Sequence, residues 1–207
     1  MKPKLTIYSR EVPSREPRVD FSGRDMSEGL AGAERAHLSA GVESLTKGNI
    51  PDAIESFLKV LNINQKNPEA CLFMGILCKR MRDYNDAIRY LDQAIKSDPA
   101  NSEAYMERGL AILEKRSGLW TDANAALVDF SSAFLLNPNE VRALYFMGVC
   151  KHRMMDYTDA LALFERYGEL VPVDILAARE LEIYRCKTRY LMHYSEMSML
   201  YGRNIYS

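Results

Sequence analysis

Small and large apolar residues recur along this chain with a period of about 34 residues. The smallest are glycines spaced 34, 34 and 39 residues apart, at Gly41, Gly75, Gly109 and Gly148. Alanines follow at intervals of 34, 39 and 34 residues, at Ala53, Ala87, Ala126 and Ala160. Four residues beyond each alanine stands a large apolar residue, at Phe57, Leu91, Phe130 and Phe164. Each unit is therefore expected to form two helices that meet at the small residues, with the large side chain in the core.

The end of each unit is marked by a further series, in which three of the four residues are helix-stopping prolines: Gln65, Pro99, Pro138 and Pro172. This combination of period and residue types resembles the tetratricopeptide (TPR) repeat, a pair of antiparallel helices. The resemblance covers about residues 34–172 and implies an all-α solenoid. In such a solenoid, helical hairpins stack into a right-handed superhelix.

The chain changes character on both sides of the repeats. Residues 1–26 contain Pro3, Pro13 and Pro17 and are expected to form an extended N-terminal arm. Four repeats are predicted within residues 27–172, over about 34–67, 68–101, 102–140 and 141–174. Residues 173–201 contain neither proline nor glycine and are predicted to form a capping helix over the last repeat, followed by a tail at 202–207.

The third unit is five residues longer than the pattern, and the insertion is expected near residues 115–121. This segment holds Trp120, the only tryptophan of the chain. In one interpretation the inserted loop folds back and Trp120 fills a gap within the repeat. In the other, Trp120 is an exposed anchor for a partner, because tryptophan is enriched at interface hot spots.

The charge balance and apolar runs exclude several classes of protein. The formal net charge is −1, with 27 Lys and Arg against 28 Asp and Glu, so nucleic acid is not an expected partner. No apolar run reaches the roughly 18 residues of a membrane span, so no membrane insertion is expected. The four cysteines lack a Cys-x-x-Cys pair and are expected to be reduced. A cytoplasmic location, possibly cytoskeletal or ciliary in the narrower hypothesis, fits these features.

The chain is not expected to be an enzyme, because it lacks a recognisable nucleophile with its base, a metal cluster or a phosphate loop. Its histidines, His37, His152 and His193, lie in distant units. Cys150 and His152 are two residues apart and would point about 200° apart on a helix, so they cannot share a metal ion. No cofactor and no metal site is predicted.

The TPR resemblance implies that recurring positions on the first helix of each unit line a concave groove. Mapped onto this chain, the partner-binding groove is predicted to comprise Leu38, Val42, Leu45, Leu72, Ile76, Lys79, Met106, Leu110, Leu113, Tyr145, Phe146 and Val149. Nearly all of these side chains are apolar, more than a solvated surface normally carries. The occupant is expected to be a peptide or helix of another protein, or the N-terminal arm of the same chain. In a third interpretation these residues simply pack against one another.

One role within the family is excluded by charge. TPR co-chaperones hold the C-terminal carboxylate of a heat-shock chaperone with basic and amide side chains. At the corresponding positions the first three units carry Leu38, Val42, Leu72, Phe73, Glu103 and Glu107. Their carboxylates would repel such a ligand.

The sequence therefore predicts a non-catalytic scaffold that binds other proteins, either as an adaptor or structural subunit of a larger multiprotein assembly, or as a soluble regulatory adaptor that binds a peptide transiently. The partner and the oligomeric state do not follow from the pattern.

Overall fold

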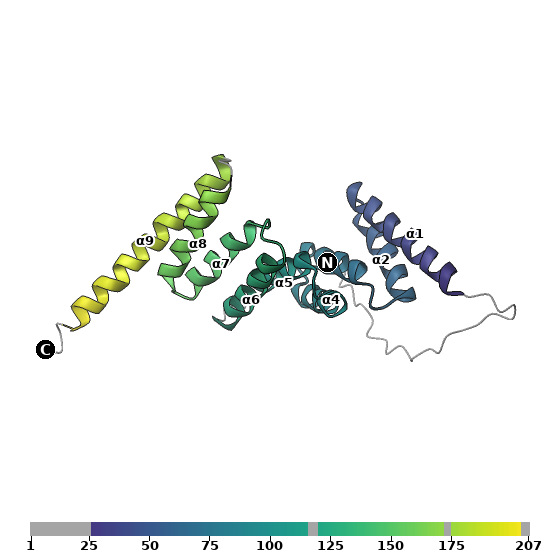
Figure 1. The fold of residues 1–207 in the computed structure, drawn as a ribbon, viewed down its shortest axis with the longest axis horizontal. Helices are drawn as coiled ribbons and strands as arrows, with labels where there is room; N and C mark the ends of the chain where they lie inside the picture. Colours follow the sequence, from purple (N-terminus) through teal and green to yellow (C-terminus); the bar gives the residue numbers. More distant parts are fainter. Residues whose placement is uncertain (1–25, 116–119, 172–174, 204–207) are drawn as a thin grey trace, which may run out of the picture.

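The computed structural model describes residues 26–115, 120–171 and 175–203, and this part of the chain contains nine α-helices and no strand. The helices are α1 (Met26–Thr46), α2 (Ile50–Ile63), α3 (Pro68–Arg80), α4 (Tyr84–Ser97), α5 (Ser102–Glu114), α6 (Trp120–Leu136), α7 (Arg142–Arg153), α8 (Tyr157–Leu170) and α9 (Ile175–Arg203). Figure 1 shows the first eight as successive hairpins in a curved row, with α9 against the last of them. The chain is thus an all-α TPR-type solenoid with a C-terminal capping helix.

Side-chain caps and prolines set where several helices begin. Asn67 caps α3, because its side-chain oxygen accepts a hydrogen bond from the amide of Ala70 at 2.7 Å. Asp83 and Asp156 cap α4 and α8 in the same way. Pro51 occupies the first turn of α2, where no intrahelical donor is lost. These local signals explain why the hairpins form where the repeat pattern places them.

Each hairpin closes where a glycine of its first helix meets the large residue of its second. A Cβ added to Gly75 would lie 2.5 Å from Cγ of Leu91, and one added to Gly41 would lie 2.6 Å from Cε1 of Phe57. The sequence interpretation was that only a side chain larger than alanine would force the helices apart. That limit is wrong, because even the methyl group of alanine overlaps the opposing side chain.

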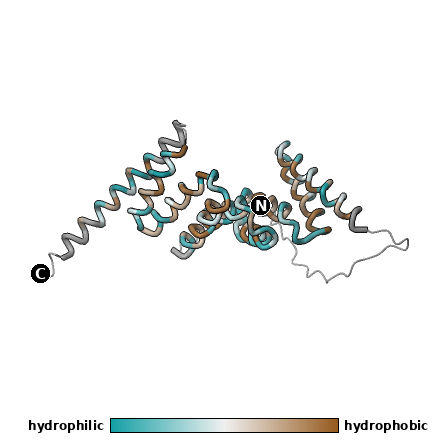
Figure 2. Tube along the Cα trace, viewed as in Figure 1, coloured by the Kyte–Doolittle hydropathy of each residue, from teal (hydrophilic) through white to brown (hydrophobic). Residues whose placement is uncertain are grey.

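The buried side chains form two apolar clusters along the row. One joins the first two hairpins and the start of α5, with Phe57, Met74 and Leu91 fully buried. The other joins the last two hairpins around Phe130 and Phe164. Hydrophobic positions accordingly occur along all four hairpins in Figure 2.

An aromatic contact recurs at three of the four junctions along the row. Phe57 of the first hairpin stacks on Phe73 of the second, with ring centroids 5.0 Å apart. The contacts Phe130–Phe146, at 5.3 Å, and Phe164–Tyr184, at 5.6 Å, repeat it further along. The place of the aromatic residue at the second junction is taken by Glu107, which pairs with Lys79 at 2.5 Å.

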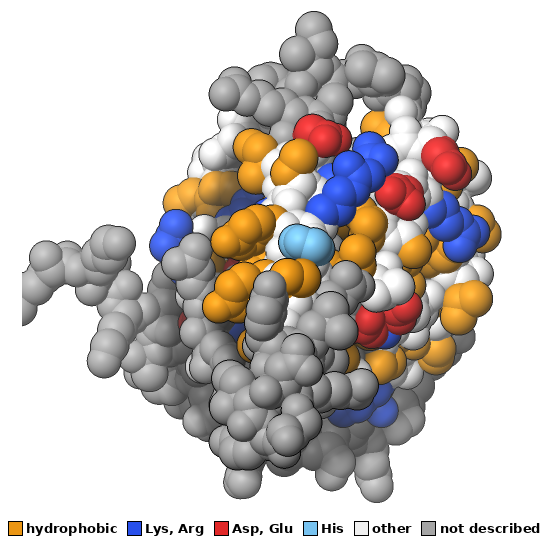
Figure 3. Space-filling model, turned by 90° about the vertical axis from the view of Figure 1, so that its left-hand side faces the viewer, with side chains coloured by type: hydrophobic (Ala, Val, Ile, Leu, Met, Phe, Trp, Pro, Cys, Tyr) orange, Lys and Arg blue, Asp and Glu red, His pale blue; other side chains and the backbone are white. Residues whose placement is uncertain are grey.

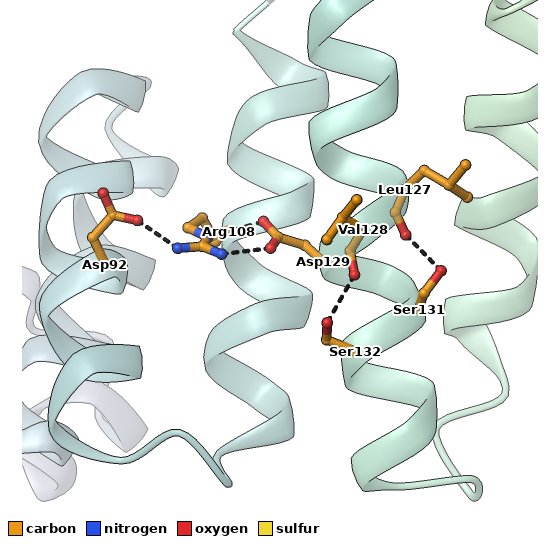
Figure 4. Close-up of polar contacts among 7 residues, drawn as sticks. All are labelled: Asp92, Arg108, Leu127, Val128, Asp129, Ser131 and Ser132. Atoms are coloured by element: carbon orange, nitrogen blue, oxygen red, sulfur yellow. Dashed lines mark hydrogen bonds and ion pairs between the residues drawn. The ribbon is translucent and has the colours of Figure 1, made fainter.

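Charged groups also hold the middle of the solenoid, between the two apolar clusters. Arg108 of α5 donates two hydrogen bonds to the carboxylate of Asp129 on α6, at 2.6 and 2.9 Å. A third nitrogen of its guanidinium donates to Asp92 on α4 at 2.6 Å (Figure 4). The side chain of Asp129 is only 3% exposed, so its charge depends on Arg108 for compensation.

Helix α9 occupies the place where the first helix of another hairpin would pack. Tyr184 contacts Phe164 as Phe146 contacts Phe130, and Thr188, four residues on, is fully buried as Cys150 is. The face of α9 that would meet a second helix instead carries the charged or exposed residues Glu182, Arg185, Cys186 and Arg189. This polar face explains how α9 ends the stack.

Two boundary predictions need correction. Trp120 is the first residue of α6 rather than part of a loop, because three of the five inserted residues lengthen that helix relative to α2, α4 and α8. The predicted tail begins inside α9, which continues to Arg203. The side chain of Trp120 and residues 1–25, which include the predicted arm, lie outside what the structure describes.

Replacing Gly75 by alanine is expected to lower the free energy of unfolding by about 1–3 kcal/mol, because the added methyl group overpacks against Leu91. Gly32 is the matched control, since it also lies in a helix but has no atom within 4 Å of an added Cβ. Gly32→Ala should stabilise by about 0.5–1 kcal/mol through helix propensity. Urea unfolding followed by circular dichroism measures both, and equal effects would contradict the close-contact explanation.

Asp129→Ala is expected to cost about 3 kcal/mol, because it leaves the partly buried Arg108 without its bidentate partner. Removing both charges, with Arg108→Met and Asp129→Leu together, should cost much less, since no buried charge is left uncompensated. Chemical denaturation of the three chains tests this. A double variant as unstable as Asp129→Ala would show that the charge balance is not the cause.

Candidate functional site

The predicted groove residues come from α1, α3, α5 and α7, the first helices of the four hairpins, and the structure divides them by exposure. Four are buried and belong to the apolar clusters: Leu72, Met106, Leu113 and Val149. Their exposed fractions are 7% or less. These four side chains are packed between helices and present little surface to a ligand.

The remaining apolar side chains of the predicted groove are at least partly accessible. Val42 is exposed, whereas the half-buried members are Leu38, Leu45, Ile76, Leu110, Tyr145 and Phe146. Each half-buried residue leans on one of the two clusters. The structure thus leaves a discontinuous apolar surface along the first helices.

A pocket of about 290 Å³ opens at the N-terminal end of this surface, between α1 and the start of α3. It is lined by Ala31, Glu34, Arg35, Leu38, Asn67, Pro68 and Glu69. Leu38 supplies apolar surface, while Arg35 and Glu69 supply exposed charges of opposite sign. The pocket can therefore hold an apolar side chain together with polar groups beside it.

Hydrogen bonds fix the wall of this pocket. The carboxylate of Glu34 accepts from the side-chain amides of Asn64 and Asn67, at 3.0 and 2.5 Å. Asn67 also caps α3, so α1 is tied to the start of the next hairpin. Arg35 and Glu69 were not among the predicted groove residues, although their equivalent places at the starts of neighbouring first helices could have identified them.

Lys79 is not a free cation of the groove. Its ammonium group pairs with Glu107, and the two side chains are only 14% and 16% exposed. Burial, together with the neighbouring Glu107, raises the pKa of Glu103 at the start of α5. The middle of the first-helix surface is consequently acidic and internally paired rather than basic.

The second basic cluster noted in the sequence is also engaged. Lys151 pairs with Asp156 and Asp159, each at 2.7 Å. Arg153 donates a hydrogen bond from Nη1 to the backbone carbonyl of Leu113 at 3.1 Å, across from α7 to α5. These bonds tie repeats and turns together and leave little free positive charge for an acidic partner.

An aromatic cluster closes the C-terminal end of the first-helix surface. Tyr145 of α7 contacts Phe146, Phe164, Tyr167 and Tyr184, with ring centroids between 5.2 and 5.8 Å apart. Tyr145 was predicted as a groove residue, and the structure places it in this cluster with α9 packed over it. Sequence reasoning missed Tyr184, since its role depends on where α9 docks.

His152 joins this cluster to α9 through a buried polar contact. Its Nδ1 lies 3.0 Å from Oγ1 of Thr188, which is fully buried. Burial lowers the pKa of His152, and the nearby positive charge of Lys187 lowers it further. A neutral ring can accept the threonine hydroxyl at Nδ1, whereas a charged ring carries only donors.

The cysteine thiols show no sign of activation. Burial raises the pKa of Cys71 to about 11 and the pKa values of Cys78 and Cys150 to about 12. Cys186 is exposed, and the adjacent carboxylate of Glu182 raises its pKa. All four are free, and thiols with raised pKa values make poor nucleophiles.

Two searches of the described residues found no further chemistry. Within residues 26–115, 120–171 and 175–203, no three His, Cys, Asp or Glu side chains are grouped so that they could bind a metal ion. None of the helices described is both long and apolar enough to cross a bilayer.

Comparisons with known proteins agree with the helical-hairpin architecture. Residues 75–123 match a family model described as tetratricopeptide repeat. The chain is 28% identical over 144 residues to tetratricopeptide repeat protein 6 from Homo sapiens, a match that covers 68% of this chain and 26% of that protein. It is 38% identical over 72 residues to Protein STIP1 homolog from Dictyostelium discoideum, covering 32% of this chain and 12% of that protein. The matches therefore span about a quarter and about an eighth of these two relatives.

Among solved structures, the chain resembles the crystal structure of MamA, with a TM-score of 0.63 and 24% sequence identity. The superposition covers 79% of this chain and 90% of MamA. At this level of identity the likeness concerns the fold.

Acidification is expected to weaken the attachment of α9. Because the folded state holds the pKa of His152 below its ordinary value, the unfolded chain binds a proton more readily. The stability contributed by neutral His152 is complete above about pH 6.5 and is lost as the pH falls below that value. His152→Asn should reduce the difference between the melting temperatures at pH 7.5 and pH 5. An unchanged difference would show that His152 does not carry this dependence.

Proposed function

Because this chain is a tetratricopeptide-repeat protein, we propose that it is a non-catalytic scaffold that binds a segment of another protein along the first helices of its hairpins. The fold as such suggests protein–protein interaction. The observation that carries the narrower proposal is the open pocket of about 290 Å³ between α1 and α3, which contains Leu38. It combines apolar surface with the charged side chains of Arg35 and Glu69.

The exposed part of the surface indicates what kind of segment would fit. Val42 and the half-buried Leu38, Leu45 and Ile76 provide apolar contacts at the N-terminal half. Farther along, Glu103 and the paired Glu107 give the surface an acidic character. An apolar segment followed by a basic residue fits this order, whereas a terminal carboxylate would be repelled.

Within this function, a lasting place in a multiprotein assembly is the first candidate, and a cytoskeletal or ciliary setting is its most specific form. Transient regulatory binding of a peptide is the alternative. The N-terminal arm is a further candidate occupant of the same surface in cis. Its apolar residues, among them Leu5, Ile7 and Phe21, are supplied by the sequence.

Leu38→Glu is expected to reduce recovery of co-purifying proteins about tenfold, since a buried charge at a contact costs at least about 1.4 kcal/mol. Leu135→Glu is the matched control, because Leu135 is 80% exposed on α6, a second helix of its hairpin, away from the proposed surface. Affinity isolation of tagged full-length chains from native cells, with quantitative mass spectrometry, measures both. Equal recovery with the two variants would contradict binding at the pocket.

A chain lacking residues 1–25 separates the occupants. If the arm fills the surface in cis, its removal should increase partner recovery. If a partner segment is the sole occupant, recovery should stay the same in the truncated chain and still fall with Leu38→Glu.

A further inference from the structure

Helix α9 has three distinct faces. One face docks on the last hairpin through Tyr184, Thr188 and Met192, of which Thr188 is fully buried and Met192 accepts a contact from Thr158. A second face is polar and exposed, with Glu182, Cys186 and Arg189. The third face is also exposed but mostly apolar, and its role is not explained by the packing of this chain.

This third face, the α9 seam, consists of Ile183, Lys187, Tyr190, Tyr194 and Met197. Ile183, Tyr190 and Tyr194 are 60%, 69% and 66% exposed. The rings of Tyr190 and Tyr194 lie with centroids 6.5 Å apart and planes 20° apart. Large apolar side chains so exposed in succession along one helix face indicate a surface that another molecule covers. Figure 3 views the molecule from this end, where hydrophobic side chains lie on the surface beside charged ones.

The spacing along the seam indicates that the covering element is a helix. Successive seam residues are separated by four, three, four and three positions. This alternation is the heptad pattern by which one helix presents a continuous stripe to another. An extended peptide, with its period of two, would not match the stripe.

The charges beside the seam favour a second copy of the same helix. The described positions that flank the seam are Tyr184 and Leu191 on one side and Cys186 and His193 on the other. None of these flanking residues carries a carboxylate, and Lys187 is the one permanent charge within the seam. Two copies would therefore meet without a repulsive carboxylate pair, provided that their lysines are kept apart.

We propose that α9 of a second copy covers the α9 seam in antiparallel orientation, forming a homodimer. This arrangement goes beyond the proposed partner binding and uses a different surface. In the register centred on Met192, Tyr190 packs with Tyr194 of the second copy, and Lys187 packs with its Met197. The two lysines lie at opposite ends of the contact. Each ammonium group then lies near a tyrosine ring, where cation–π attraction is available.

The fold leaves room for this pairing. Thr158, the second residue of α8, contacts Met192, so α9 passes the start of α8 near that residue and continues to Arg203. Figure 1 shows this end of α9 extending away from the hairpins. With the symmetry axis at Met192, the two sets of hairpins lie at opposite ends of the paired helices.

Light scattering coupled to size-exclusion chromatography tests the dimer with the full-length chain. The expected mass is twice the chain mass of 23.6 kDa at micromolar concentrations. Tyr190→Glu combined with Tyr194→Glu should halve the mass, while circular dichroism and the melting profile of the hairpins stay unchanged. Leu135→Glu, an equal change at an exposed apolar residue of α6, should leave the dimer intact. A monomeric natural chain, or a dimer that survives the double substitution, would overturn the proposal.

Cross-linking tests the orientation. In a Cys186→Ser background, chains with Tyr190→Cys and chains with Tyr194→Cys are mixed and oxidised. Antiparallel pairing predicts a disulfide-linked heterodimer in the mixture and little linkage in either chain alone. Preferential linkage of Tyr190→Cys to itself would overturn the antiparallel arrangement. Partner recovery in the Leu38→Glu experiment is independent of these outcomes, so each proposal can fail separately.

Discussion

The close contact between the two helices of each hairpin is the constraint on which the rest of the structure depends. The glycine of the first helix leaves room for a large residue of the second, as at Gly75 and Leu91. Both helices thus approach until ring or branched side chain rests on bare backbone. Because the same contact recurs in four hairpins, the hairpins have similar shapes and can stack in one direction. The curvature, the core and the surface of first helices all follow from this stacking.

The chemistry between hairpins is less uniform than the chemistry within them. Three junctions rely on an aromatic residue packed on the large residue of the preceding hairpin, as in Phe57 and Phe73. The second junction replaces this contact with the ion pair of Lys79 and Glu107, and Arg108 bridges α4 and α6 beside it. The apolar core is correspondingly divided in two. Removing one member of such a buried set is costly, so the middle of the solenoid tolerates little change in charge.

The surface available to partners is determined by how tightly neighbouring first helices pack. Positions that appear equivalent in the repeat pattern have different exposure: Val42 is exposed, Ile76 is half-buried and Val149 is 7% exposed. The accessible apolar groups concentrate at the ends, in the pocket beside Leu38 and on the α9 seam. A scaffold with such a distribution can bind different molecules at its two ends.

The sequence by itself determined the helical hairpins, because glycine, alanine, large apolar residue and proline recur at intervals that only one helical geometry satisfies. It also determined the starts of α3, α4 and α8, through local caps whose bonds span three residues. Only the tertiary structure decided which predicted groove residues are buried, since burial of Met106 or Leu113 depends on neighbours from other hairpins. The same holds for the buried contact of His152 with Thr188 and for the role of Tyr184. These pairs are distant in sequence and carry no shared period, so their contact follows from the stacking angle rather than from any local pattern.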